Sequence, residues 1–167
     1  IPTINGIIKD KLDYVGFLFI GLIKVGNEPY VIEYNVRMGD PETQVVLPRI
    51  KNDFLDLMVS TSQGKLKEKS LELDEMTYTN VVLASSGYPE SYEKGKVIEG
   101  IEGVLDSSVL HAGTINKNGQ VLTNGGRVLS IVSKSKNISG ALKKSYDSIQ
   151  KVHFEGKTYR KDIGFDL

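Results

Sequence analysis

The stretch Val31–Gln44 constrains the fold more than any other part of the sequence. Apolar and polar residues alternate from Val31 to Arg37, which predicts a strand because successive side chains of a strand point to opposite faces. One face of this strand is apolar. The other face carries three polar side chains in a row, Glu33, Asn35 and Arg37.

The polar face has the residue types of a phosphate-linked metal site. Glu33 and Asn35, two residues apart on one face, can direct two hard oxygen atoms to one point, which suits a magnesium ion shared with phosphates. Arg37, one step further along, suits a phosphate or a carboxylate. The alternative is a solvated strand face, although such a face more often carries Lys, Thr and Ser.

After this strand the sequence predicts a turn and then a helix. Met38-Gly39 forms the turn, since glycine accepts a positive φ. Asp40 is then the helix N-cap and Pro41 the first helical residue. Glu42 falls in the first turn, where a carboxylate meets the positive end of the helix dipole. Helix capping is therefore one explanation for both carboxylates, and a functional role is the other.

Composition excludes several classes of protein. The 167 residues include 21 Lys and Arg and 21 Asp and Glu, so a zero net charge argues against a general nucleic-acid or membrane-surface binder. There is no cysteine and there are two histidines, which excludes disulfides and makes a multi-histidine metal site improbable. No apolar run approaches the ~18 residues of a membrane span and no signal peptide is visible, so we expect a cytoplasmic protein.

The first part of the chain is expected to contain a hairpin and helices. The predicted elements are helix Ile4–Asp10, strands Tyr14–Val25 and Tyr30–Arg37 in an antiparallel hairpin, helix Pro41–Leu47, and a helix capped by Asn52 or Asp53 that stops at Gly64. The charged segment Lys65–Asp74 carries no strong signal, and we interpret it as a connection.

From about Glu75 the pattern becomes rich in strands. The predicted elements are strands Met76–Ser85, Val97–Ile98, Val109–Ile115, Gln120–Thr123 and Arg127–Ser133, and helix Ile138–Val152 with Ser139 as its cap. Asn118-Gly119 is expected to be a hairpin turn. The fold class is therefore α+β, with a small β-rich unit at residues 75–167.

The stretch Val31–Gln44 resembles part of a known family. Glu33-Tyr34-Asn35-Val36-Arg37-Met38-Gly39-Asp40-Pro41-Glu42-Thr43-Gln44 is similar to the end of the ATP-grasp domain of the glycinamide ribonucleotide synthetase family. Further markers of its C-terminal domain follow in order: Leu83-Ala84-Ser85-Ser86-Gly87-Tyr88-Pro89, Lys94-Gly95-Lys96, His111-Ala112-Gly113-Thr114, Gly125-Gly126-Arg127-Val128-Leu129 and Tyr159-Arg160-Lys161-Asp162-Ile163-Gly164. The resemblance implies the end of an ATP-grasp domain at 1–64, a connection at 65–74 and the family's C-terminal domain at 75–167.

The resemblance also implies a reaction. ATP phosphorylates glycine, and the glycyl phosphate reacts with the amine of 5-phosphoribosylamine to give glycinamide ribonucleotide in purine synthesis. Glu33 and Asn35 would hold magnesium or manganese with the ATP phosphates, and Arg37 would hold the transferring phosphoryl group. Many ATP-grasp enzymes carry another acidic ligand on the preceding strand, but Tyr14–Val25 has none.

The substrates would meet other residues. The resemblance places Asp40, Glu42 and Thr43 near glycine or the amine of phosphoribosylamine, with helix capping as the rival explanation. A basic cluster must bind the ribose 5-phosphate, and the candidates are Arg127, Arg160 and Lys161. The alternatives are an ordinary hairpin turn with a surface arginine at Gly125-Gly126-Arg127, and a solvated basic pair near the terminus.

The sequence begins at Ile1 without an initiator Met, so we interpret it as a fragment of a longer, monomeric ligase. We expect the fragment to be inactive and to self-associate through residues 1–50, because the hairpin would leave strand edges unpaired. Two other hypotheses are another ATP-grasp carboxylate–amine ligase or carboxylase, and a non-catalytic β-rich binding module.

Overall fold

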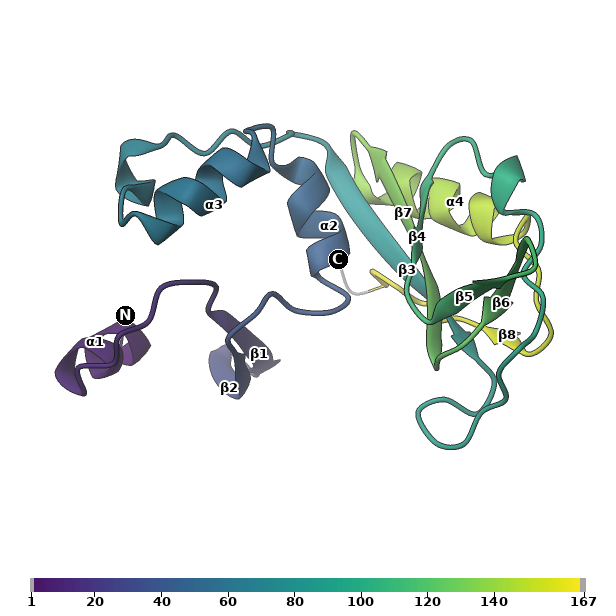
Figure 1. Cartoon of the computed structure of the whole chain (residues 1–167), viewed down its shortest axis with the longest axis horizontal. Coiled ribbons are helices and arrows are strands. Elements are labelled where there is room, and N and C mark those ends of the chain that lie inside the picture. Colours follow the sequence, from purple (N-terminus) through teal and green to yellow (C-terminus); the bar gives the residue numbers. More distant parts are fainter. Residues whose placement is uncertain (1, 166–167) are drawn as a thin grey trace. The chain divides into compact units, whose positions relative to one another are not determined.

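The computed structural model describes residues 2–165. They fall into two compact units, here called the first unit, within Ile1–Gly39 and Ile50–Leu73, and the second unit, within Asp40–Arg49 and Asp74–Leu167. Helices and antiparallel sheets both occur, which confirms the α+β class (Figure 1). Within the described residues, no helix has the length and apolar character needed to cross a membrane.

The first unit contains the predicted antiparallel hairpin. Helix α1 (Pro2–Lys9) precedes strand β1 (Phe19–Val25), which pairs with β2 (Glu28–Asn35). β1 is shorter than predicted, since it starts at Phe19. The strand register shifts once, between Gly21 and Leu22, so Gly21 lies opposite Glu33 while Leu22 lies opposite Val31.

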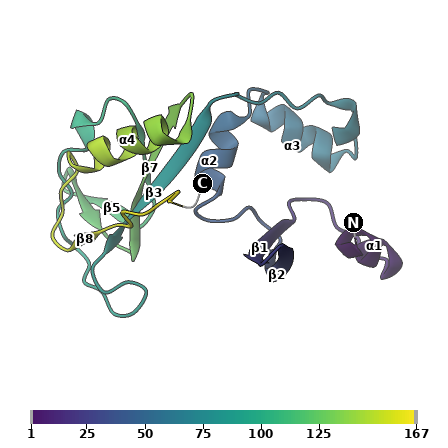
Figure 2. The ribbon, with the colours of Figure 1, turned by 180° about the vertical axis from the view of Figure 1, so that it is seen from behind.

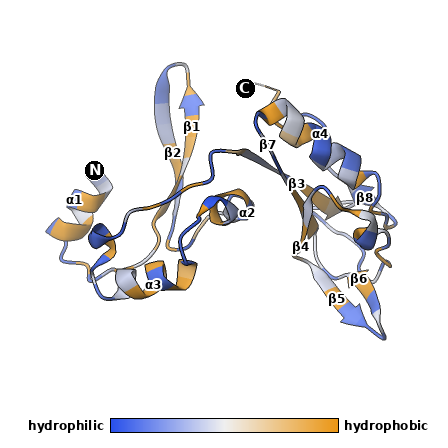
Figure 3. Ribbon diagram, turned by 90° about the horizontal axis from the view of Figure 1, so that it is seen from above, coloured by the Kyte–Doolittle hydropathy of each residue, from blue (hydrophilic) through white to orange (hydrophobic). Residues whose placement is uncertain are grey.

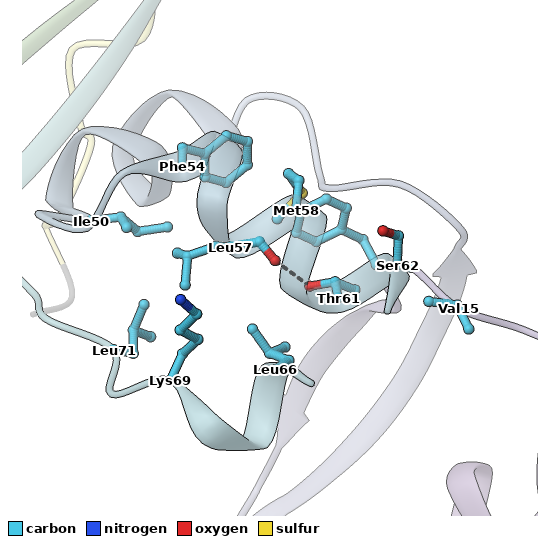
Figure 4. A pocket seen from close by; sticks show the side chains of 12 residues that line it. Val15, Ile50, Phe54, Leu57, Met58, Thr61, Ser62, Leu66, Lys69 and Leu71 are labelled. Atoms are coloured by element: carbon cyan, nitrogen blue, oxygen red, sulfur yellow. Dashed lines mark hydrogen bonds between the residues drawn. The ribbon is translucent and has the colours of Figure 1, made fainter. Parts of the chain in front are cut away.

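Helix α3 (Phe54–Ser62) completes the first unit together with the 3₁₀ turn η2 (Leu66–Glu68). Asp53, one of the two predicted caps, caps α3 by accepting a hydrogen bond from the Asp56 backbone N–H at 3.0 Å. One side of α3 lines an apolar pocket of about 470 Å³ (Figure 4). Its lining includes Val15, Phe17, Ile50, Phe54, Leu57, Met58, Leu66 and Leu71.

The second unit is built on a four-stranded antiparallel sheet in the order β4-β7-β3-β8. The strands are β3 (Thr77–Ser85), β4 (Ser108–His111), β7 (Arg127–Ser135) and β8 (Lys157–Thr158). β5 (Thr114–Lys117) and β6 (Gln120–Thr123) form a separate hairpin around the predicted Asn118-Gly119 turn. The remaining elements are helix α2 (Thr43–Val46), the 3₁₀ turns η1 (Leu47–Arg49) and η3 (Ile101–Gly103), and helix α4 (Ile138–Ile149).

The core of the second unit lies between α4 and the sheet. α4 contacts β3 and β7, and it lies beside them in both ribbon views (Figures 1 and 2). Like α1 and α3, it carries both hydrophobic and hydrophilic segments (Figure 3). The buried cluster comprises Val81, Leu83, Ile98, Val128, Leu129, Ile131, Ile149, Val152 and Phe154. Burial of this apolar surface is the main source of stability for the unit.

Three predicted elements of the second unit are wrong in detail. The single strand expected at Val109–Ile115 is two strands, β4 and β5, because the chain bonds to β7 as far as Gly113 and then pairs with β6 from Thr114 onward. The strand expected at Val97–Ile98 consists of isolated bridges. Asn137, not Ser139, caps α4, since its side chain accepts from the Gly140 N–H at 2.8 Å.

Candidate functional site

Glu33 and Asn35 lie on one face of β2, as the alternation predicts. The Asn35 side-chain amide donates to Glu33 Oε1 at 3.0 Å, so the two polar groups converge on one point. Gly21 lies opposite Glu33, and a Cβ on Gly21 would come within 2.9 Å of Glu33 Cγ. The glycine therefore leaves the space that the Glu33 side chain uses.

This pair fits a divalent cation in its chemistry, since carboxylate and amide oxygens are the ligands that magnesium prefers. Within residues 2–165, no group of three or more His, Asp or Glu side chains gathers in a way that could hold a metal. The two residues would thus supply a minority of the ligands, with phosphates and water completing the shell. Arg37 follows β2, is exposed, and donates to the Met38 carbonyl at 2.9 Å. The roles of all three remain predictions.

Asp40 and Arg127, both predicted from the sequence as substrate residues, are brought into direct contact in the second unit. Arg127 Nη1 donates to the Asp40 backbone carbonyl at 2.9 Å, and Nη2 lies 3.1 Å from Asp40 Oδ2. The arginine side chain is 39% exposed and the aspartate side chain 50%. Residues that are 87 positions apart therefore form one polar cluster that water can reach.

The prediction that Asp40 caps a helix is wrong. Helix α2 begins at Thr43, with Glu42 in the N-cap position at αR angles; in the described part of the chain Glu42 makes no side-chain capping bond. The Asp40 carboxylate instead accepts from Gln44 Nε2 at 2.9 Å and pairs with Arg127, so it is drawn away from the helix N–H groups. Capping therefore does not explain either carboxylate.

The glycines before Arg127 serve packing. β6 pairs with β5, and β7 pairs with β3 and β4, so this loop connects two sheets and is not a hairpin turn. A Cβ on Gly126 would lie 2.0 Å from the Tyr88 ring, and one on Gly125 would lie 2.9 Å from the Gly113 Cα. Ser85 fixes the same loop by donating its hydroxyl to the Gly125 carbonyl at 3.0 Å and its N–H to the Gly126 carbonyl at 2.8 Å.

The other basic candidates lie near the end of the second unit. Arg160 donates through Nε and Nη2 to the two carboxylate oxygens of Asp162 at 2.9 and 2.7 Å. This fork-like pairing holds the pKa of Asp162 below its ordinary value. Lys161 is exposed. Arg160 is thus already matched to a carboxylate in an ideal geometry.

Sequence reasoning missed three residues that fix the segments around Asp40 and Arg127. Gln44 and Tyr88 both stand inside recognised motifs, but periodicity alone did not reveal their partners. Asn80 carries no motif signal, yet its side-chain amide donates to the Pro41 carbonyl at 3.1 Å and so fixes the chain beside Asp40. Tertiary contacts of this kind follow from the fold and not from local spacing.

Two family models match this chain, and they cover the segments that carry the candidate residues. Residues 1–43 match the model described as "Phosphoribosylglycinamide synthetase, ATP-grasp (A) domain". Residues 78–166, just over half of the chain, match "Phosphoribosylglycinamide synthetase, C domain". The chain belongs to this synthetase family. The resemblance seen in the motifs is therefore confirmed, and both the strand with Glu33 and the segment with Arg127 lie inside the matched ranges.

Individual relatives agree with the family models. Over 98% of its length the chain is 41% identical to the phosphoribosylamine–glycine ligase of Fusobacterium nucleatum and 44% identical to that of Halalkalibacterium halodurans. The crystal structure of the phosphoribosylamine–glycine ligase of Thermotoga maritima matches with a TM-score of 0.83 and 40% identity over 96% of the chain. The chain spans 38–40% of the length of these proteins.

Proposed function

We propose that this chain is the C-terminal portion of a cytoplasmic phosphoribosylamine–glycine ligase of purine biosynthesis. The ligase would join glycine to 5-phosphoribosylamine through a glycyl phosphate, giving glycinamide ribonucleotide, ADP and phosphate. The observation that carries this proposal is the contact of Glu33 with Asn35 on a strand that matches the ATP-grasp domain. The relatives are phosphoribosylamine–glycine ligases, which supports glycine as the acid that is activated.

The proposed division of labour follows the sequence. Residues 1–64 would be the last part of the ATP-grasp domain, 65–74 a connection, and 75–167 the C-terminal domain. A divalent cation, Mg²⁺ or Mn²⁺, would neutralise the charge of the ATP phosphates. Glu33 and Asn35 would hold it, and Arg37 would bind the transferring phosphoryl group, because phosphoryl transfer depends on alignment and charge neutralisation.

The acceptor substrate would bind to the second unit. Asp40, Glu42 and Thr43 would orient the nitrogen of glycine or of phosphoribosylamine, since a carboxylate pairs well with a protonated amine. Arg127, together with Arg160 or Lys161, would hold the ribose 5-phosphate. The contact between Arg127 and Asp40 supports this assignment, because it places an anion-binding group beside a group suited to an amine.

The test uses the complete ligase that contains this chain. Glu33→Gln or Asn35→Ala should lower turnover at least ~100-fold, the scale of losing a phosphoryl-transfer contact. Glu28→Gln, an exposed change at the other end of β2, is the matched control and should leave turnover unchanged. Near-normal turnover of both site variants at saturating magnesium would contradict the metal role.

Product analysis separates this function from that of another ATP-grasp ligase. The complete enzyme should consume ATP only when glycine and 5-phosphoribosylamine are both supplied, and the product should carry the glycyl amide. Formation of a different amide, or ATP consumption with another acid and no glycine, would show that the chain belongs to a ligase of different specificity.

A further inference from the structure

The Arg127–Asp40 pair joins two groups that the proposed function needs for substrate. One terminal nitrogen of Arg127 donates to the Asp40 backbone carbonyl, and the other pairs with the Asp40 carboxylate. The second carboxylate oxygen of Asp40 accepts from Gln44. In this state the arginine already holds an anion, and the carboxylate already holds a cation, so a charged substrate group must compete with this pair.

Resting on the proposed function, we propose that this pair exchanges partners when the acceptor substrate binds. The phosphate of the phosphosugar amine takes the place of the Asp40 carboxylate on Arg127. The released Asp40 carboxylate then binds the amine of the same substrate. A phosphate dianion competes well, since it carries more charge than a carboxylate and matches the planar guanidinium with two oxygens.

The surroundings confine this exchange to side chains. Tyr88 covers Gly126, and Ser85 binds the carbonyls of both glycines before Arg127, so the start of β7 is fixed. On the other side, Asn80 holds the Pro41 carbonyl. The pair itself is half exposed, and ion pairs that water reaches are weak. Separating Arg127 from the Asp40 carboxylate therefore costs little free energy and requires no movement of β7.

Two further atoms indicate what kind of ligand fits. Within residues 2–165, Gln44 Oε1 and Asn80 Oδ1 are buried acceptors that receive no hydrogen bond. Buried acceptors normally find a donor, because leaving one unpaired is costly. Gln44 binds Asp40, and Asn80 binds the next residue, so both amides flank the carboxylate. A ligand with N–H or O–H donors as well as a phosphate suits this cluster better than inorganic phosphate.

Arg160 offers a matched comparison within the same unit. Its guanidinium meets both oxygens of Asp162 in a fork, whereas Arg127 shares one carboxylate oxygen and one backbone carbonyl of Asp40. The bidentate pair is the harder one to displace. Exchange is therefore assigned to Arg127. The Arg160–Asp162 pair should stay closed when the phosphosugar binds, which leaves Lys161 as the residue that would hold the phosphate together with Arg127.

The experiment measures the dissociation constant of ribose 5-phosphate by calorimetry in the complete ligase. Arg127→Ala should weaken binding by at least about tenfold, the scale of a lost charged hydrogen bond. Asp40→Asn removes the competitor and should tighten binding about threefold, the scale of an exposed ion pair. The same variant should lower kcat/KM for phosphoribosylamine. Asp147→Asn removes an exposed ion pair with Lys143 on α4 and should leave the dissociation constant unchanged.

The opposite signs for binding and catalysis in Asp40→Asn separate exchange from a structural role, which would weaken both. Asp40→Ala lacks the same carboxylate and provides a second measurement should the first variant fold poorly. If both Asp40 variants weaken ribose 5-phosphate binding, exchange is wrong while the proposed phosphate site stands. If Arg127→Ala binds ribose 5-phosphate normally, the phosphate site lies elsewhere. Absence of glycine-dependent turnover in the unaltered ligase would instead contradict the proposed function itself.

Discussion

The two units bury their apolar side chains to very different extents. In the second unit, nine hydrophobic residues form one buried cluster, and Val81, Leu83 and Ile131 are completely inaccessible. In the first unit, Leu57 is the one buried hydrophobic residue among those that the structure describes. The hairpin strands expose their apolar side chains instead, including Leu22, Ile23, Tyr30, Val31 and Ile32.

This contrast separates stability from the proposed phosphate chemistry. The second unit has a core of its own and can order the Asp40–Arg127 cluster by itself. The hairpin that carries Glu33 and Asn35 has ordinary strand pairing but little burial, and pairing of two strands alone is marginal in water. The residues predicted to touch ATP therefore lie on the part that depends most on additional contacts.

The largest expected effect concerns self-association. The exposed apolar hairpin should bring copies of the isolated chain together, since exposed patches and free strand edges favour association. Removing residues 1–39 should convert the chain to a monomer and keep cooperative unfolding, because the buried cluster draws on residues from 81 to 154. Sedimentation velocity with and without residues 1–39 measures this. A monomeric full chain, or association that survives the removal, would contradict it.

The next prediction compares one residue type in the two units. Leu83→Ala should lower the free energy of unfolding by about 2–5 kcal/mol, because Leu83 is fully buried and the change leaves a cavity. Leu22→Ala, at a side chain that is 58% exposed, should change it by about 0.5 kcal/mol or less. Urea unfolding of both variants decides the matter. Equal losses would show that the hairpin is packed as tightly as the core.

A smaller effect is expected at the glycine pair before Arg127. Gly126→Ala should cost about 1–3 kcal/mol, because its Cβ would overlap the Tyr88 ring and force the ring away. Gly103→Ala, in the same unit but with open space around its Cβ, should be nearly neutral. Thermal unfolding measures both. A neutral Gly126→Ala would mean that Tyr88 moves freely and does not hold the Arg127 loop.

Local features of the fold could be predicted from the sequence, whereas features that depend on tertiary contacts could not. The hairpin, the Asp53 cap, β3, β6, β7 and α4 follow from periodicity and turn residues, and these predictions are confirmed. The break between β4 and β5 does not follow, because it comes from a change of pairing partner, from β7 for β4 to β6 for β5. Residues that are adjacent in space and distant in sequence leave no local signal.

The candidate site shows the same limit. The alternation correctly placed Glu33 and Asn35 on one face. Asp40 had the sequence context of a helix cap, and its actual partner, Arg127, lies 87 residues away. Local preference predicted the cap, and a charged partner from another element displaced it. Arg127 and Arg160, the two arginines predicted to bind the ribose phosphate, are each paired with an aspartate, which no spacing rule indicates.

The smallest predicted effect is a pH dependence of stability that arises at Asp74, shortly before β3 begins. The Met76 backbone N–H, the Tyr78 hydroxyl at 2.8 Å and Lys134 at 3.0 Å all donate to its carboxylate, which holds the pKa of Asp74 well below its ordinary value. A lowered folded-state pKa means that the stabilisation is complete above about pH 4, the unfolded value, and is lost as the pH falls through the folded-state pKa.

Asp74→Asn should therefore lower the thermal midpoint at pH 7 and make it less sensitive to acid, so that the two unfolding curves converge below pH 4. The carboxylate is 17% exposed, which limits screening by salt. Asp56→Asn in the first unit is the control, because the Asp56 side chain is 54% exposed in its pair with Lys69, and its midpoint should follow that of the unaltered chain. Parallel curves for Asp74→Asn and the unaltered chain at all pH values would show that the hydrogen bonds to Asp74 contribute nothing that depends on its charge.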